Sequence, residues 1–236
     1  MSQTLTNQAL HQRRSRVVAK GNASATDRYM VKGEGALLTD VEGNTYIDFA
    51  GGIAVMNVGH SHPRVVAAIK RQAEQLTHTC FMVSPYPPAV TLAERLCDLV
   101  PGQAPKAAMF ANSGAEAVEN AVKIARYHTA KSGIIAFENA FHGRTLMGMT
   151  LTSKVKPYKY GFGPYAPEVY RMPFAYCYRC PLNLTYPSCD TACAHCLADM
   201  FVKQVAPEQT AAIIVEPIQG EGGFITPPMD LSLIHI

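Results

Sequence analysis

The sequence lacks the features that would link it to a membrane, a secretory route or a nucleic acid. No stretch among its 236 residues approaches the roughly 18 consecutive apolar residues of a membrane helix. Its N-terminus is polar and has no apolar signal-peptide core. The net charge is only +3, and the basic cluster Arg13, Arg14 and Arg16 is better explained as a solvated arm than as a nucleic-acid tail. We therefore expect a cytoplasmic protein with no membrane or nucleic-acid partner.

Two further absences concern phosphate and disulfide chemistry. No Gly-Lys-Ser/Thr sequence is present, which disfavours a P-loop nucleotide binder. Seven cysteines in a cytosolic protein argue against a disulfide framework and leave metal binding or plain burial. Five of them lie close together, at Cys177, Cys180, Cys189, Cys193 and Cys196. This spacing fits a structural zinc site or an iron–sulfur cluster, or else an insertion in which reduced cysteines simply pack.

Apolar side chains recur at helical spacing in three segments. They predict a helix over 65–76 that follows Pro63, a second over 92–100 and a third over 118–125. Residues 1–30, in contrast, are polar and show no sustained period.

Strands are predicted between these helices. The short apolar runs 107–110, 134–137 and 211–215 are typical of buried strands, and 36–49 has the alternation and central Gly-Asn of a hairpin. Strands alternating with helices predict an α/β fold with a mostly parallel sheet. Ligands of such sheets bind at the carboxyl ends of the strands, where three motifs of this sequence lie.

The first motif is Asn-Ser-Gly-Ala at 112–115, at the start of a predicted helix. Free N–H groups at a helix N-terminus suit a phosphate, Gly114 lets the backbone approach closely, and Ser113 offers a hydroxyl. Alternatively, Ser113 only caps the helix in a capping box with Glu116. Both interpretations can hold together.

The second motif is Phe-His-Gly-Arg at 141–144. A flat ring such as Phe141 can cover one face of a planar cofactor, and Arg144 can hold a carboxylate with two parallel hydrogen bonds. The plainer interpretation is a turn with a core phenylalanine and a surface arginine. His142 by itself indicates a structural histidine.

The third motif is Glu-Pro-Ile-Gln-Gly-Glu-Gly-Gly at 216–223. A carboxylate at the end of a buried strand needs partners, so Glu216 and Glu221 can hold cationic groups or restrain an arginine. The alternative is a solvated acidic turn. The last lysine of the sequence is Lys203, so no lysine follows this motif.

With Gly-Gly-Ile-Ala-Val at 51–55 and Gly-His-Ser-His-Pro at 59–63, these motifs resemble the class III aminotransferases, pyridoxal-phosphate (PLP) enzymes of fold type I. The order and spacing are similar from about Tyr46 to Pro228. The resemblance implies the N-terminal part of such an enzyme: part of the mostly parallel large-domain sheet with its flanking helices, plus an N-terminal segment of the small domain.

The same resemblance implies a domain division. Residues 1–57 would form an N-terminal arm and hairpin belonging to the small domain. Residues 58–230 would form an incomplete large PLP-binding domain with a cysteine-rich insertion at 176–197. Residues 231–236 do not continue the family pattern and resemble translated vector sequence, so we expect a non-native tail.

Within the family, the chain is most similar to bacterial 4-aminobutyrate aminotransferases. Ala115 stands where acetylornithine enzymes usually have threonine, Ile53 stands where ornithine enzymes have tyrosine, and Tyr-Gly-Phe-Gly-Pro at 160–164 is similar to the corresponding segment. The implied activity is transfer of an amino group from an ω-amino acid such as 4-aminobutyrate to 2-oxoglutarate, in a homodimer. Alternatives are an acetylornithine or ornithine aminotransferase, or a non-enzymatic cysteine-rich metal-binding module.

The resemblance also implies roles for the cofactor-binding residues. Ser113, Gly114 and Ala115 would hold the cofactor phosphate, Phe141 would stack on the pyridine ring, and His142 would support it. No catalytic residue is implied within the chain, because the Schiff-base lysine and the aspartate that pairs with the pyridine nitrogen follow later in the family pattern. We therefore expect the chain by itself to be inactive and its full-length parent to be active.

Four further residues are implied to bind or select the substrate. Arg144 would bind the distal carboxylate, and Ile53 would line the substrate channel. Glu221 would pair with, or release, an arginine that lies later in the family pattern, and Glu216 would support the site.

Overall fold

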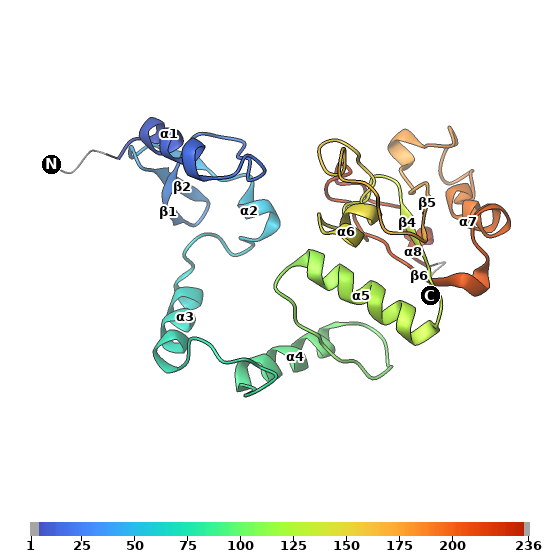
Figure 1. The fold of residues 1–236 in the computed structure, drawn as a ribbon, viewed down its shortest axis with the longest axis horizontal. Coiled ribbons are helices and arrows are strands. Elements are labelled where there is room, and N and C mark those ends of the chain that lie inside the picture. Colours follow the sequence, from blue (N-terminus) through green and yellow to red (C-terminus); the bar gives the residue numbers. More distant parts are fainter. Residues whose placement is uncertain (1–4, 234–236) are drawn as a thin grey trace. The chain divides into compact units, whose positions relative to one another are not determined.

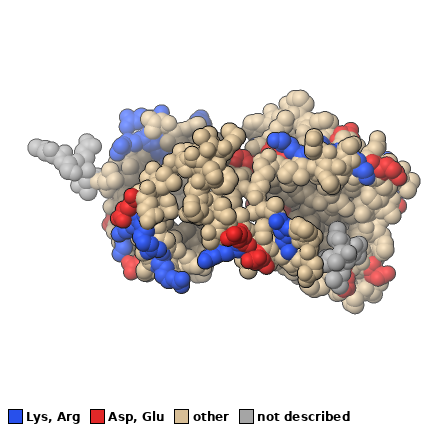
Figure 2. Space-filling model, turned by 90° about the horizontal axis from the view of Figure 1, so that it is seen from below, with Lys and Arg blue, Asp and Glu red and all other residues tan. Residues whose placement is uncertain are grey.

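A computed structural model describes residues 5–233 of the chain. It divides into two compact units, Met1–Arg95 and Leu96–Ile236, both drawn in Figure 1. On the face in Figure 2, side chains of both charge signs are dispersed among uncharged ones, in keeping with the small net charge. No helix in the described part of the chain has the length and apolar content needed to cross a bilayer.

The first unit is built on a three-stranded antiparallel sheet of order β1-β2-β3. The strands are β1 (Met30–Glu34), β2 (Leu37–Asp40) and β3 (Thr45–Ile47). The predicted hairpin is confirmed, with Leu37 opposite Ile47. Gly43 turns the chain with φ of +86°, in the left-handed region that glycine tolerates best.

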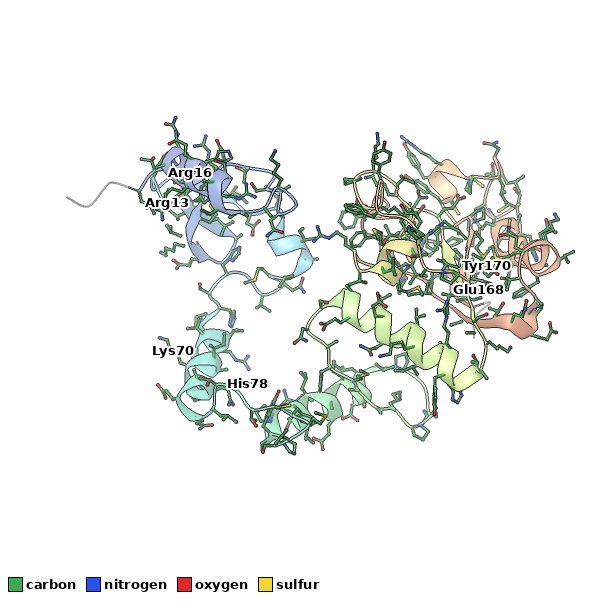
Figure 3. The ribbon with its side chains drawn as sticks, in the orientation of Figure 1. Arg13, Arg16, Lys70, His78, Glu168 and Tyr170 are labelled. Carbon is green, nitrogen blue, oxygen red and sulfur yellow. The ribbon has the colours of Figure 1, made fainter. Side chains whose placement is uncertain are left out.

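A helix that the sequence did not predict packs on this sheet. Helix α1 (Asn7–Val17) starts after Thr6, whose side chain accepts a hydrogen bond from the backbone of Ala9. Asp40 is 1% exposed and accepts hydrogen bonds from Asn7 Nδ2 and the Tyr46 hydroxyl, both at 2.9 Å. This carboxylate therefore fastens α1 to the hairpin. Arg13 and Arg16 are exposed on α1 (Figure 3).

Three more helices follow, namely α2 (Gly51–Ala54), α3 (Pro63–Gln75) and α4 (Pro87–Leu99). The helices predicted after Pro63 and over 92–100 are thus confirmed. Proline begins both α3 and α4, where its missing N–H would be unpaired anyway. Helix α3 has no buried residue, and Val65 and Ile69 on its apolar stripe are exposed.

The second unit contains a parallel sheet of order β5-β4-β6. Its strands are β4 (Gly133–Phe137), β5 (Val169–Met172) and β6 (Thr210–Ile213). Its helices are α5 (Gly114–Thr129), α6 (Leu146–Leu151), α7 (Ala192–Lys203) and α8 (Met229–Leu233), with 3-10 turns at Cys177–Arg179 and Pro207–Gln209. The predicted α/β class is confirmed.

The central strand β4 is buried along its whole length and separates two apolar clusters. Ile135 and Phe137 pack with Met200 of α7 on one face. Ile134 packs with Val122 of α5 on the other. Successive side chains of a strand point to opposite faces, so helices cover both sides of the sheet and its carboxyl edge is left for loops.

Two expectations about the strands need correction. Residues 107–110 form no strand, and no segment within 5–233 pairs with them. Met109 is 64% exposed, so neither a ladder nor a core supports the apolar run. Strand β5 was not predicted, and its Tyr170 donates a hydrogen bond of 2.9 Å to Glu168 (Figure 3).

The C-terminal expectation is only partly covered by the structure. Helix α8 includes the first residues of the expected non-native tail, and Leu231 lies in the apolar core of the second unit. Residues 234–236 lie outside the described residues. The non-native origin of 231–236 and the domain limits at 57 and 230 stay predictions.

Candidate active site

The first two motifs meet at one hollow of the second unit. It is open to solvent, and its space together with the solvent at its mouth amounts to about 1060 Å³. Its lining consists of the N-terminal turn of α5 and the loop between β4 and α6, namely Ser113, Gly114, Ala115, Val118, Phe141, His142, Gly143, Arg144 and Thr145. The predicted cofactor residues and the predicted carboxylate-binding arginine are therefore brought together.

Helix α5 offers unpaired backbone donors to this hollow. Ser113 caps the helix by accepting a hydrogen bond from Glu116 N at 3.2 Å, and the Glu116 carboxylate accepts one from Asn112 N at 2.6 Å. Within residues 5–233, the N–H groups of Gly114 and Ala115 have no hydrogen-bond partner. A Cβ added at Gly114 would meet open space. The capping role of Ser113 is confirmed, and the two free N–H groups remain available to an anion.

A glycine allows the second motif to approach the helix so closely. Gly143 has φ of +117°, and a Cβ at that position would lie 2.9 Å from the Cβ of Ala115. Real side-chain carbons do not approach to that distance, so any larger residue would push the 141–144 loop away from α5. The glycine of the second motif therefore shapes the hollow.

Phe141 is half-buried, and its ring meets that of Tyr158 edge-on, with centroids 4.9 Å apart. The next residue, His142, is 7% exposed and donates its backbone N–H to Thr152 Oγ1 at 3.0 Å. Burial lowers the pKa of His142, the charge of Glu216 opposes this shift, and Arg171 adds to it. The imidazole is therefore neutral at pH 7, as a structural histidine would be.

The third motif packs against the second through Glu216. One carboxylate oxygen of Glu216 accepts the Phe141 N–H at 2.7 Å, and the other accepts the Gly220 N–H at 3.0 Å. Gln219 is fully buried and donates from Nε2 to the Glu138 carbonyl at 2.8 Å. These bonds join the loops that follow β4 and β6. Glu216 thus supports the loop that presents the aromatic ring.

The two remaining charged residues of the motifs, Arg144 and Glu221, are exposed to solvent. Arg144 is exposed, and its guanidinium has no hydrogen-bond or ion-pair partner in the described part of the chain. Glu221 forms an ion pair with Lys154 at 3.1 Å. Hydrogen bonding from Tyr158 and then from Lys154 lowers the pKa of Glu221. Glu221 is therefore an ionised carboxylate paired with Lys154.

Ile53 lies in the first unit. It is 90% exposed and has φ of +56° in a kinked part of α2. Its role in a substrate channel stays a prediction.

The structure does not bring all five cysteines of the predicted metal site together. Cys177, Cys180, Cys189 and Cys193 line a small, mostly apolar hollow, but Cys196 instead directs its Sγ toward the Ala192 carbonyl on α7. Among residues 5–233, no three His, Cys, Asp or Glu side chains are grouped to hold a metal ion. All seven cysteines are free.

Two of these thiols lie in surroundings that favour their neutral form. Burial raises the pKa of Cys177 and of Cys193, and neighbouring thiols add to the rise. The zinc or iron–sulfur assignment therefore stays a prediction, and an insertion in which reduced cysteines pack remains the alternative.

Several contacts of the site were missed from the sequence. Thr152 and Gln219 are fully buried and hold the two loops, while Tyr158 and Lys154 contact Phe141 and Glu221. All four lie in irregular segments with no hydrophobic period. Only the Gln beside the glycines of the third motif offered a signal.

Comparisons with known proteins agree with this geometry. The family model "Aminotransferase class-III" matches residues 18–232. A probable 4-aminobutyrate aminotransferase of Bacillus subtilis is 53% identical over 230 residues, covering 96% of this chain and 53% of the relative. A 5-aminovalerate aminotransferase of Pseudomonas aeruginosa is 45% identical over 219 residues, covering 93% of this chain and 50% of the relative.

A solved structure extends the likeness to three dimensions. The PLP-bound amine transaminase from an uncultivated Pseudomonas species superposes with a TM-score of 0.78 at 28% identity, covering 89% of this chain and 50% of that one. The fold and the sequence together identify the chain as about half of an α/β transaminase. The chain belongs to the class III aminotransferases and spans about half the length of the curated relatives it matches.

Proposed function

We propose that the full-length protein transfers an amino group from an ω-amino acid such as 4-aminobutyrate to 2-oxoglutarate, with PLP as its cofactor. The observation that carries the proposal is the single hollow shared by the α5 N-terminus, Phe141 and Arg144. Family membership and relatives that act on 4-aminobutyrate and 5-aminovalerate support the substrate class.

The residues present fit the cofactor. Two unpaired N–H groups at Gly114 and Ala115, with the Ser113 hydroxyl beside them, suit a phosphate, and the open space at Gly114 leaves room for it. Phe141 would cover the ring, and neutral His142 would hold the loop through its backbone. When bound, PLP supplies the electron sink for amino-group transfer. The lysine that this chemistry needs would come from the part of the protein outside this chain.

Arg144 is the residue that would recognise the substrate. Its exposed guanidinium has no partner within residues 5–233, whereas an ω-amino acid carries a carboxylate at the end opposite its amine. A fork of two parallel N–H bonds matches a carboxylate better than a lysine ammonium does. Glu216 would act by holding the Phe141 loop, and Ile53 would line the channel in the assembled enzyme.

We also infer that the full-length protein is a cytoplasmic homodimer. The exposed apolar stripe of α3 supports an assembly, because Val65 and Ile69 are covered by no described residue. Sedimentation of the full-length protein would test this, and a monomer at micromolar concentration would contradict it.

The substrate proposal is tested on the purified full-length enzyme. Absorbance changes of the bound cofactor report each half-reaction, with 4-aminobutyrate, 5-aminovalerate, N-acetylornithine and ornithine compared as donors. We expect 4-aminobutyrate and 5-aminovalerate, which have no substituent beside their carboxylate, to react with the highest kcat/KM. A faster reaction with N-acetylornithine or ornithine would overturn the assignment.

Arg144 offers a sharper version of the same test. Hydrogen bonds to charged groups contribute about 1.5–3 kcal/mol, so Arg144→Met should lower kcat/KM for 4-aminobutyrate by roughly 10- to 150-fold. Arg144→Lys keeps the charge and should recover only part of the loss. An amine without a carboxylate should be affected little by either change. Unaltered kinetics of Arg144→Met with 4-aminobutyrate would contradict the proposal.

A further inference from the structure

The first unit contains a short left-handed turn. Four consecutive residues, Gly51 to Ala54, have φ between +52° and +62°. Glycine tolerates this region well, but a residue with a Cβ does not, and β-branched isoleucine is among the least suited. Ile53 nevertheless occupies the third position of the turn. The backbone strain therefore falls on the residue that is proposed to line the substrate channel.

No packing within residues 5–233 compensates for this strain. The side chain of Ile53 is 90% exposed, so it gains little from its neighbours in the described part of the chain. Residues in such conformations persist only where the surrounding structure fixes them, and they cluster at active sites. The turn must therefore be held by groups other than the Ile53 side chain.

Asp48 holds the start of the turn. Its side chain is 8% exposed, and Oδ1 accepts the N–H groups of Ala50 and Gly51, both at 3.0 Å. The other oxygen, Oδ2, lies 2.7 Å from His60 Nε2. This hydrogen bond is the first cause that lowers the pKa of Asp48, so the carboxylate is ionised and Nε2 is the donor. One carboxylate thus joins the turn to His60.

His60 is in turn fixed to the antiparallel sheet. Its backbone exchanges two hydrogen bonds with Gly35, of 2.8 and 3.0 Å, at the connection between β1 and β2. Its side chain packs directly on β1, because a Cβ added at Gly33 would lie 2.8 Å from the His60 Cβ. The contacts therefore run from the sheet through His60 and Asp48 to the left-handed turn.

We propose that Asp48 and His60 are positioning residues that hold residues 51–54 in the left-handed turn and thereby present Ile53 to the amino donor. The inference rests on the channel role proposed for Ile53. An apolar side chain leaves a charged substituent without a partner, so it disfavours a donor such as ornithine, which has an ammonium group beside its carboxylate. The pair acts on donor choice through Ile53, without touching the donor.

The test compares kcat/KM for 4-aminobutyrate with kcat/KM for ornithine on the full-length enzyme. Both values come from one preparation, so their ratio does not depend on the fraction of enzyme that is folded, and a merely structural defect leaves it unchanged. Asp48→Ala and His60→Ala should each lower the ratio about two- to tenfold, as expected for one hydrogen bond. Asp48→Asn keeps an acceptor for the two N–H groups and should retain most of the ratio.

Two further variants make the result specific. Ile53→Gly removes the presented side chain at a φ that glycine tolerates, and in this background Asp48→Ala should lower the ratio no further. Asp40→Ala is the matched control, because Asp40 is a buried carboxylate of the same unit that bonds to Asn7 and Tyr46 instead of the turn. It should lower the urea midpoint and leave the ratio unchanged.

The outcomes separate this inference from the proposed function. An unchanged ratio in both Asp48→Ala and His60→Ala, or an equal fall when Asp48→Ala is added to Ile53→Gly, overturns the positioning role. The loss of activity toward 4-aminobutyrate in Arg144→Met would then still support the proposed amino-group transfer. If Ile53→Gly alone leaves the ratio unchanged, the channel role of Ile53 fails and the inference fails with it.

Discussion

Replacing Thr152 with valine should destabilise the loop that carries Phe141 and Arg144. Thr152 has no exposed surface. Its hydroxyl oxygen accepts the His142 N–H at 3.0 Å and lies 2.9 Å from the Gly148 carbonyl and 3.1 Å from the Gly143 carbonyl. Valine keeps the shape and removes the polar atom, so a buried N–H loses its acceptor.

The magnitude follows from that single loss. A buried donor left without a partner costs about 1–3 kcal/mol, and because valine has nearly the shape of threonine this lost hydrogen bond dominates the change in stability. Urea unfolding of the full-length protein followed by circular dichroism should show this decrease. Cofactor affinity, measured by fluorescence titration, should also fall, because the 141–144 loop lines the proposed cofactor hollow.

Thr210→Val is the matched control. Thr210 is half-buried at the start of β6, and its hydroxyl makes one bond of 3.2 Å to the Ala206 carbonyl. Since no buried donor is orphaned there, a decrease below about 1 kcal/mol is expected. Equal effects of the two changes would refute the hydrogen-bond reasoning.

Two other predictions concern the same loop. Gly143→Ala should lower the free energy of unfolding by about 1–3 kcal/mol and weaken cofactor binding, because the new Cβ would lie 2.9 Å from that of Ala115 and the backbone has a strained φ. Gly21→Ala is the control: this position is open and its φ is ordinary, so the same denaturation and titration should show no change. Burial holds the pKa of His142 below the ordinary 6.5, so the folded state binds fewer protons and stability is complete above that pH and declines as pH falls below it. His142→Gln should flatten this decline in unfolding measured from pH 7.5 to 5; an unaltered slope would show that other groups cause it.

The spacing of apolar residues predicted most of the regular elements. The apolar spacing of α3, α4 and α5 and the apolar runs of β4 and β6 identified these elements directly. Strand β5 was not predicted because Arg171 interrupts its short apolar run. Helix α1 was not predicted because it is mostly polar. A hydrogen bond between Asn7 and Asp40, rather than an apolar stripe, joins it to the hairpin.

The site was predictable only as far as backbone chemistry dictates it. A serine-capped helix start with glycine at its first position indicates an anion site whatever surrounds it. The contacts of Thr152 and Tyr158 depend on how separate loops pack, and no local spacing encodes that. The run at 107–110 shows the reverse error, because apolar composition alone does not supply a neighbouring strand.

The junction between the loops after β4 and β6 also bears on engineering. Glu216 bonds to the backbone of one loop from the other, and a Cβ at Gly222 would lie 2.8 Å from the Asn139 carbonyl. A chimera that takes only one of these segments from a transaminase of different selectivity would lose either the hydrogen bond to Glu216 or the close contact at Gly222. Recombination between family members should therefore exchange both segments as one cassette, with its crossovers placed inside the buried strands.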